Sequence, residues 1–119
     1  MFYKAFFVTG QANKTIMDSG LVSSVEEPKT IKAILIDVSL YCGNILEGWI
    51  ETERILEIDD RVLNSSYLTG ADQCAVSTSK IVRIPIDEDV KAGMIFKIGI
   101  NCGAAESNIS GAYEYIRTL

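Results

Sequence analysis

The chain of 119 residues contains no histidine. This absence removes the commonest general base and the commonest metal ligand of proteins. Ser–His and Cys–His nucleophile pairs cannot form within the chain. A zinc site would need cysteine and carboxylate ligands alone, and no two of the three cysteines lie close in sequence. The composition therefore predicts a protein that is not an enzyme and that holds no cofactor or metal ion.

The sequence also lacks clusters of basic residues and long apolar runs. The net charge is −5 and the Lys and Arg residues are scattered singly, so a nucleic-acid phosphate backbone is not an expected partner. No segment approaches the roughly 20 apolar residues of a membrane helix. The segment Phe2–Val8 is short, carries Lys4 and has no small-residue cleavage site, so we expect neither membrane insertion nor a signal peptide.

The three cysteines are an odd number. Cys42 and Cys102 each end an apolar run just before a glycine, which places both on the inward side of their predicted strands. Free buried cysteine often behaves as a small hydrophobic residue. A disulfide between Cys42 and Cys102 is the alternative if those strand ends are neighbours.

Alternation of apolar and polar residues is the strongest pattern present. It runs through Leu46–Ile58 and recurs in Met94–Cys102, and side chains of a β-strand point alternately to its two faces. Turns rich in Gly, Pro and Asn separate such segments. The sequence predicts one domain over residues 1–119, an antiparallel β-sandwich of the jelly-roll type with about seven or eight strands and at most one or two short helical turns.

Turn and cap residues predict how the strands are connected. Gly43-Asn44 is a tight-turn dipeptide, so we expect Lys29–Cys42 and Leu46–Ile58 to form a hairpin. Asp87–Ala92 resembles one helical turn capped by Asp87, and Asp59–Thr69 is ambiguous between helix and loop. Strand parity predicts an apolar core made of Ile34, Ile36, Val38, Leu40, Leu46, Ile50, Leu56, Val82, Ile84, Met94, Phe96, Ile98 and Ile100.

Acidic residues crowd one segment of the chain: Glu47, Glu51, Glu53, Glu57, Asp59 and Asp60. Paired carboxylates could perform acid–base chemistry on a sugar or bind calcium. The favoured interpretation is a solvated acidic strand face, which also discourages pairing between sheet edges. The run Asp87–Asp89 is interpreted as a helix cap rather than a cation site, because negative charge at a helix N-terminus complements the helix dipole.

Trp49, the only tryptophan, falls on the acidic side of its strand. It could stack on a sugar ring or anchor a subunit contact, where tryptophan is enriched. Alternatively, a loop of the same chain covers Trp49, and the side chain then has only a packing role.

Three N-glycosylation sequons begin at Asn13, Asn64 and Asn108, and all are predicted to lie in loops. Loops are rich in Asn, Ser and Thr in any case. The sequons favour a virion or cell surface over the cytoplasm.

Two strand segments, Phe2–Thr9 and Ile31–Leu40, are apolar on both faces, whereas a sandwich needs only one apolar face per strand. We therefore expect a homo-oligomer or contact with other shell subunits, as in capsid, cement or decoration proteins. The predicted interface residues are Phe2, Tyr3, Phe7, Ile31, Leu35, Tyr41 and Trp49. The alternative is a carbohydrate-binding module that uses Trp49, Tyr113, Tyr115 and nearby carboxylates.

Overall fold

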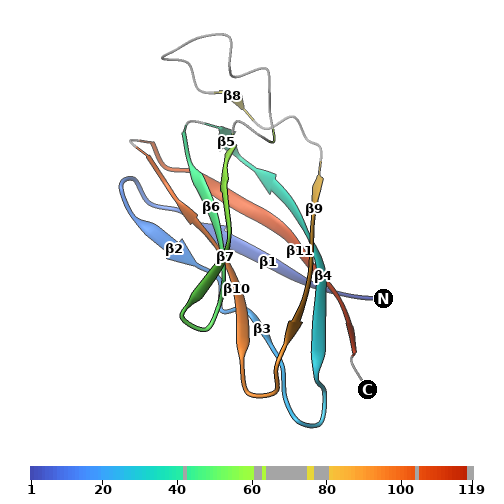
Figure 1. Ribbon diagram of the computed structural model, residues 1–119. Coiled ribbons are helices and arrows are strands. Elements are labelled where there is room, and N and C mark those ends of the chain that lie inside the picture. Colours follow the sequence, from blue (N-terminus) through green and yellow to red (C-terminus); the bar gives the residue numbers. More distant parts are fainter. Residues whose placement is uncertain (42, 61–62, 64–74, 77–80, 104, 118–119) are drawn as a thin grey trace.

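Two antiparallel β-sheets pack face to face in the computed structural model of the chain (Figure 1). The structure describes residues 1–41, 43–60, 63, 75–76, 81–103 and 105–117. Every regular element in these residues is a β-strand. The predicted all-β sandwich is therefore confirmed.

The first sheet, sheet A, contains four strands in the order β1 (Phe2–Thr9), β11 (Asn108–Arg117), β4 (Lys29–Val38) and β9 (Val82–Val90). The second sheet, sheet B, has the order β2 (Thr15–Met17), β10 (Ile95–Asn101), β6 (Ile45–Ile50) and β7 (Glu53–Asp59), and β3 (Leu21–Val22) also pairs with β10. A separate two-stranded ladder joins β5 (Leu40–Tyr41) to β8 (Ala75–Val76).

The strand pairs are nested along the chain. The first strand β1 pairs with the last strand β11, β2 and β3 pair with β10, β4 pairs with β9, and β6 pairs with β7 at the centre. The outermost and third pairs lie in sheet A, and the second and fourth lie in sheet B. The chain therefore crosses repeatedly between the two sheets.

The core fills the space between the sheets. The fully buried apolar side chains include Ile34, Ile36, Val38, Leu46, Phe96, Ile98 and Ile100, all predicted from strand parity. Tyr113 lies among them, with its ring 5.1 Å from Phe6 and 5.8 Å from Phe96 between centroids. Its hydroxyl donates to Asp18 Oδ2 at 2.7 Å. The prediction that Tyr113 lies on an outer face is therefore wrong.

The predicted hairpin between Lys29–Cys42 and Leu46–Ile58 is wrong. The first segment contributes β4 to sheet A, while the second is itself the β6–β7 hairpin of sheet B. Asn44 lies on the crossing between the sheets, fully buried, and its side-chain amide donates to Leu40 O at 2.8 Å and Asp60 Oδ2 at 2.9 Å. The Gly-Asn dipeptide therefore secures a crossover rather than a tight turn.

Ile31 and Tyr41 were predicted to lie on an outward face, and both are fully buried in the chain's own core. The register of β4 shifts between Ile31 and Ala33 against β9, and β11 shifts at the same level. A β-bulge reverses the parity of the side chains that follow it. Ile31 consequently points inward together with Ile34, although simple alternation separates them.

Three further predictions concern Asp87–Ala92, the cysteines and Asp59–Thr69. Asp87–Ala92 is not helical, because β9 continues to Val90 and Asp87 has a φ of 57° within that strand. Cys102 is buried with a free thiol, in agreement with its role as a small core residue, while Cys42 lies outside the described residues. The described part of Asp59–Thr69 is limited to the end of β7, Asp60 and Leu63.

Candidate functional site

The outer face of sheet A is apolar on the side of β1. Tyr3 and Phe7 project from it with 58% and 65% of their surfaces exposed. Small residues lie between and beside these rings, since Ala5 pairs with Ala112 in the neighbouring strand β11. Leu35 of β4, opposite Ala112, is half-buried on the same face. The result is a low apolar floor bordered by two exposed aromatic side chains.

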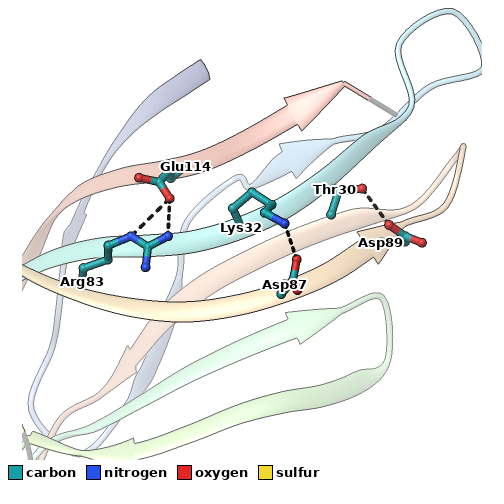
Figure 2. Close-up of polar contacts among 6 residues, drawn as sticks. All are labelled: Thr30, Lys32, Arg83, Asp87, Asp89 and Glu114. Atoms are coloured by element: carbon teal, nitrogen blue, oxygen red, sulfur yellow. Dashed lines mark hydrogen bonds and ion pairs between the residues drawn. The ribbon is translucent and has the colours of Figure 1, made fainter. Parts of the chain in front are cut away.

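The opposite half of this face, along β9, is polar (Figure 2). Arg83 donates from Nε and Nη2 to Glu114 Oε2 at 3.2 and 2.7 Å, which fastens β9 to β11 across β4. Lys32 contacts Asp87 at 2.5 Å, and Thr30 Oγ1 donates to Asp89 Oδ1 at 2.6 Å. The face thus divides into an apolar half on β1 and a polar half on β9.

The Arg83–Glu114 pair shifts the pKa of both groups. The hydrogen bond between the two groups lowers the pKa of the Glu114 carboxyl from its ordinary value and raises the pKa of the Arg83 guanidinium. Glu114 also accepts a long hydrogen bond from the Tyr3 hydroxyl at 3.4 Å. Glu114 therefore stays charged at neutral pH and connects the polar half of the face to the first aromatic ring of β1.

The outer face of sheet B carries a hollow of about 440 Å³ lined by Thr15, Met17, Glu47, Trp49, Glu51 and Lys97. Gly99 lies on this face between Met17 and Glu47, with which it pairs on its two sides. A Cβ atom at Gly99 would stand 2.1 Å from Met17 Sδ. The missing side chain therefore lets Met17 lie across β10 and form one wall of the hollow.

Trp49 forms the opposite wall and is held on both sides. Its indole Nε1 donates to Glu47 Oε1 at 3.0 Å, and the Arg54 guanidinium lies 5.8 Å from the ring centroid. Glu51, at the β6–β7 turn with a φ of 53°, accepts from the Ile95 backbone N–H at 2.9 Å. The hollow thus has one half-exposed aromatic wall, two carboxylates and the lysine Lys97.

The structure distributes the predicted interface residues among three places. Phe2, Tyr3 and Phe7 are exposed on β1, and Phe2 stacks on Tyr115 with centroids 5.6 Å apart. Trp49 lies on sheet B, away from that group. Tyr41 is buried, and burial raises the pKa of its hydroxyl.

Two of the three sequon asparagines are described. Asn13 is exposed in the turn after β1, with a φ of 59°. Asn108 is half-buried as the first residue of β11 rather than in a loop, and the following Ile109 is fully buried. Asn64 lies outside the described residues. Of the described pair, Asn13 is the more accessible to a modifying enzyme.

The acidic segment does not form one cluster. Glu47 and Glu57 are cross-strand neighbours, and Arg54 lies within 3.9 Å of the first and 2.7 Å of the second. In the described part of the chain, no group of three or more Cys, Asp or Glu residues is placed to hold a metal ion. Over the same residues, no helix is long and apolar enough to cross a membrane.

Comparison of the chain with protein-family models, curated proteins and solved structures gave no match. The two outer faces of the sandwich are therefore the features that bear on function.

Proposed function

We propose that this chain is a non-enzymatic structural subunit that assembles with copies of itself into a larger shell or surface layer. The observation that carries the proposal is the exposure of Tyr3 and Phe7 on one apolar half-face of sheet A. Contiguous exposed apolar surface bordered by polar groups is typical of protein–protein contacts. The Arg83–Glu114 pair and its neighbours supply such a polar border.

The strand order supports assignment of the sandwich to the jelly-roll class within this proposal. In a jelly roll, a long antiparallel hairpin of nested strand pairs is rolled so that alternate pairs fall in opposite sheets. The pairs β1–β11 and β4–β9 in sheet A, and β2/β3–β10 and β6–β7 in sheet B, follow that scheme. Jelly rolls are frequent among capsid subunits, although they also occur in lectins, so the fold favours assembly by analogy alone.

Light scattering coupled to size-exclusion chromatography tests the proposal. We expect the full chain to have a mass of two or more subunits, and Phe7→Glu to reduce that mass while the variant remains folded. Val25→Glu is the matched control, because Val25 is 82% exposed in a loop away from the apolar half-face. A wild-type chain that stays monomeric up to millimolar concentration would refute assembly.

Carbohydrate binding in the hollow of sheet B is the second candidate. The half-exposed ring of Trp49 beside Glu51 and Lys97 favours it, because sugars stack on aromatic faces and hydrogen-bond to charged groups. Two features weaken it: Tyr113 is in the core, and Tyr115 is occupied by Phe2.

The single tryptophan makes this second candidate easy to measure. If the hollow binds a glycan, titration with neutral and acidic oligosaccharides should shift the emission of Trp49 in a saturable manner. Lys97→Ala should weaken the titration, whereas the exposed Lys91→Ala should not. An unchanged spectrum across the panel would remove this function.

A further inference from the structure

Along the outer edge of β1, the backbone groups have no partner strand among the residues that the structure describes. Gly10 N–H donates to Ser107 O at 3.0 Å, and these residues continue the β1–β11 register beyond Thr9 and Asn108. In an antiparallel ladder, hydrogen bonds join directly opposite residues at every second position. The even-numbered residues of β1 therefore bond to β11, and its odd-numbered residues direct their N–H and C=O groups to the other side.

No strand in the described residues pairs with β1 on that side. The backbone groups directed there belong to Tyr3, Ala5, Phe7 and Thr9, whose side chains also lie on the outer face. The unpaired backbone groups and the exposed aromatic side chains of β1 therefore belong to the same set of odd-numbered residues.

The other sheet edges carry features that oppose pairing. On β9, Pro85 removes one N–H, Asp87 has a positive φ, and the exposed residues around them are charged. On β7, the exposed side chains are the charged ones of Glu53, Arg54 and Glu57. The edge formed by β2 and β3 is broken into strands of three and two residues.

Only Lys4 carries a charge on β1. Its Nζ donates to Gly20 O at 2.5 Å, so the ammonium is turned toward the β2–β3 connection. The edge carries no acidic side chain although the chain has a net charge of −5, which avoids like-charge repulsion between acidic groups if two copies meet there.

We propose that β1 pairs antiparallel with β1 of a second copy, joining two four-stranded sheets A into one continuous sheet. This inference rests on the proposed assembly function and specifies its contact. A two-fold axis at Ala5 uses only the free odd-numbered positions and places Tyr3 opposite Phe7 of the second copy, twice. Aromatic cross-strand pairs stabilise such ladders, and Ala5 at the axis leaves room for both pairs.

The area available is adequate. The exposed parts of the four aromatic side chains amount to about 500 Å², since each side chain offers 150–250 Å². Met1 is 61% exposed at the start of the same strand. With Met1 and the strand edges included, the covered surface approaches the roughly 1,200 Å² of the smallest stable interfaces.

A proline at position 5 tests the backbone contact directly. Because the Ala5 N–H faces the free edge and its side chain is exposed, Ala5→Pro should leave the β1–β11 ladder intact and block the ladder between copies. Ala5→Ser is the matched control, because it keeps the N–H. We expect Ala5→Pro to remain folded by circular dichroism and to lose at least tenfold in association, while Ala5→Ser matches the wild type.

The outcomes separate this inference from the proposed function. If folded Ala5→Pro associates as the wild type does, edge pairing is wrong while assembly stands. If the wild type itself is monomeric, both fail. If Ala5→Pro does not fold, a second variant tests the pairing. The thiols of Ala5→Cys are cross-linked with a short bifunctional bimane, which joins two cysteines only when they lie close together. Proximity at the axis should give covalent dimers linked at position 5, and their absence from an associating protein would refute the pairing.

Thr9→Cys is the control for that experiment. In the proposed register its two copies lie eight strand positions apart, about 27 Å, so it should give no covalent dimer beyond the wild-type background.

Discussion

At the scale of single residues, Tyr113 links the two sheets through both its ring and its hydroxyl. It belongs to β11, contacts Phe96 of sheet B, and its hydroxyl lies between Asp18 Oδ2 and the Ile98 N–H. Burial, reinforced by the bond to Asp18, raises the pKa of this hydroxyl, which stays protonated and donates. The hydroxyl thus satisfies one acceptor and one donor between the sheets.

We predict that Tyr113→Phe lowers the free energy of unfolding by about 1–3 kcal/mol, because the buried Ile98 N–H and the half-buried Asp18 carboxylate each lose a hydrogen-bond partner while the ring packing remains. Urea denaturation would measure the change. Tyr115→Phe is the control, since no hydrogen bond of its hydroxyl is found among the described residues. Equal effects of the two substitutions would contradict this account of Tyr113.

Asn44 has a comparable role at the crossover between the sheets. We predict that Asn44→Ala lowers the free energy of unfolding by about 2–4 kcal/mol, because Leu40 O and Asp60 Oδ2 lose their hydrogen bonds from a fully buried amide. Thermal unfolding against Asn101→Ala, a half-buried position in β10, would test this. If Asn44→Ala and Asn101→Ala lower the melting temperature equally, backbone contacts alone hold the crossover.

At the scale of elements, the β-bulge at Lys32 decides which residues of β4 belong to the core. We predict that Ile31→Ala lowers the free energy of unfolding by about 2–5 kcal/mol, as for other large-to-small changes in a packed core. Leu35→Ala should cost clearly less, because Leu35 is half-buried on the outer face. Chemical denaturation of both variants checks the parity, and a larger loss at Leu35 would contradict it.

Period-two alternation predicted the strands and most of the core because one face of each strand is buried against the other sheet. It did not predict the bulge, since the extra residue depends on pairing with two other strands. It also did not predict the two-residue turn at Glu51-Thr52, where neither glycine nor proline marks a hairpin. Alternation continues on both sides of that turn, so β6 and β7 resemble one long strand.

At the scale of the whole molecule, parity correctly placed Tyr3, Phe7 and Leu35 on an outer face. The hollow near Trp49 was not predictable, because it is formed by residues of β2, β6 and β10 that strand order brings together. The polar half of sheet A depends in the same way on pairing, since Arg83 and Glu114 are 31 residues apart.

The Arg83–Glu114 pair makes part of the stability depend on pH. The pKa of Glu114 is lowered in the folded state, so the unfolded state binds more protons as pH falls. The contribution of this pair is present above pH 4.5 and is lost as pH falls through the lowered pKa. We predict that Glu114→Gln flattens the decline of stability below pH 4.5, measured by urea denaturation at several pH values. The exposed Glu106→Gln is the control, and an unchanged slope for Glu114→Gln would refute the prediction.

The pairing of β1 with β11 has a consequence for synthesis of the chain. Tyr3 and Glu114 are 111 residues apart, so β1 emerges from the ribosome long before its partner strand exists. Contacts this distant in sequence form slowly, because a long loop must close before they are made. Throughout that interval β1 has both edges open and its aromatic side chains uncovered. The risk of aggregation during translation is therefore concentrated in the same strand that we propose for assembly. A chaperone that protects nascent β1 would benefit this protein more than one that protects any later strand.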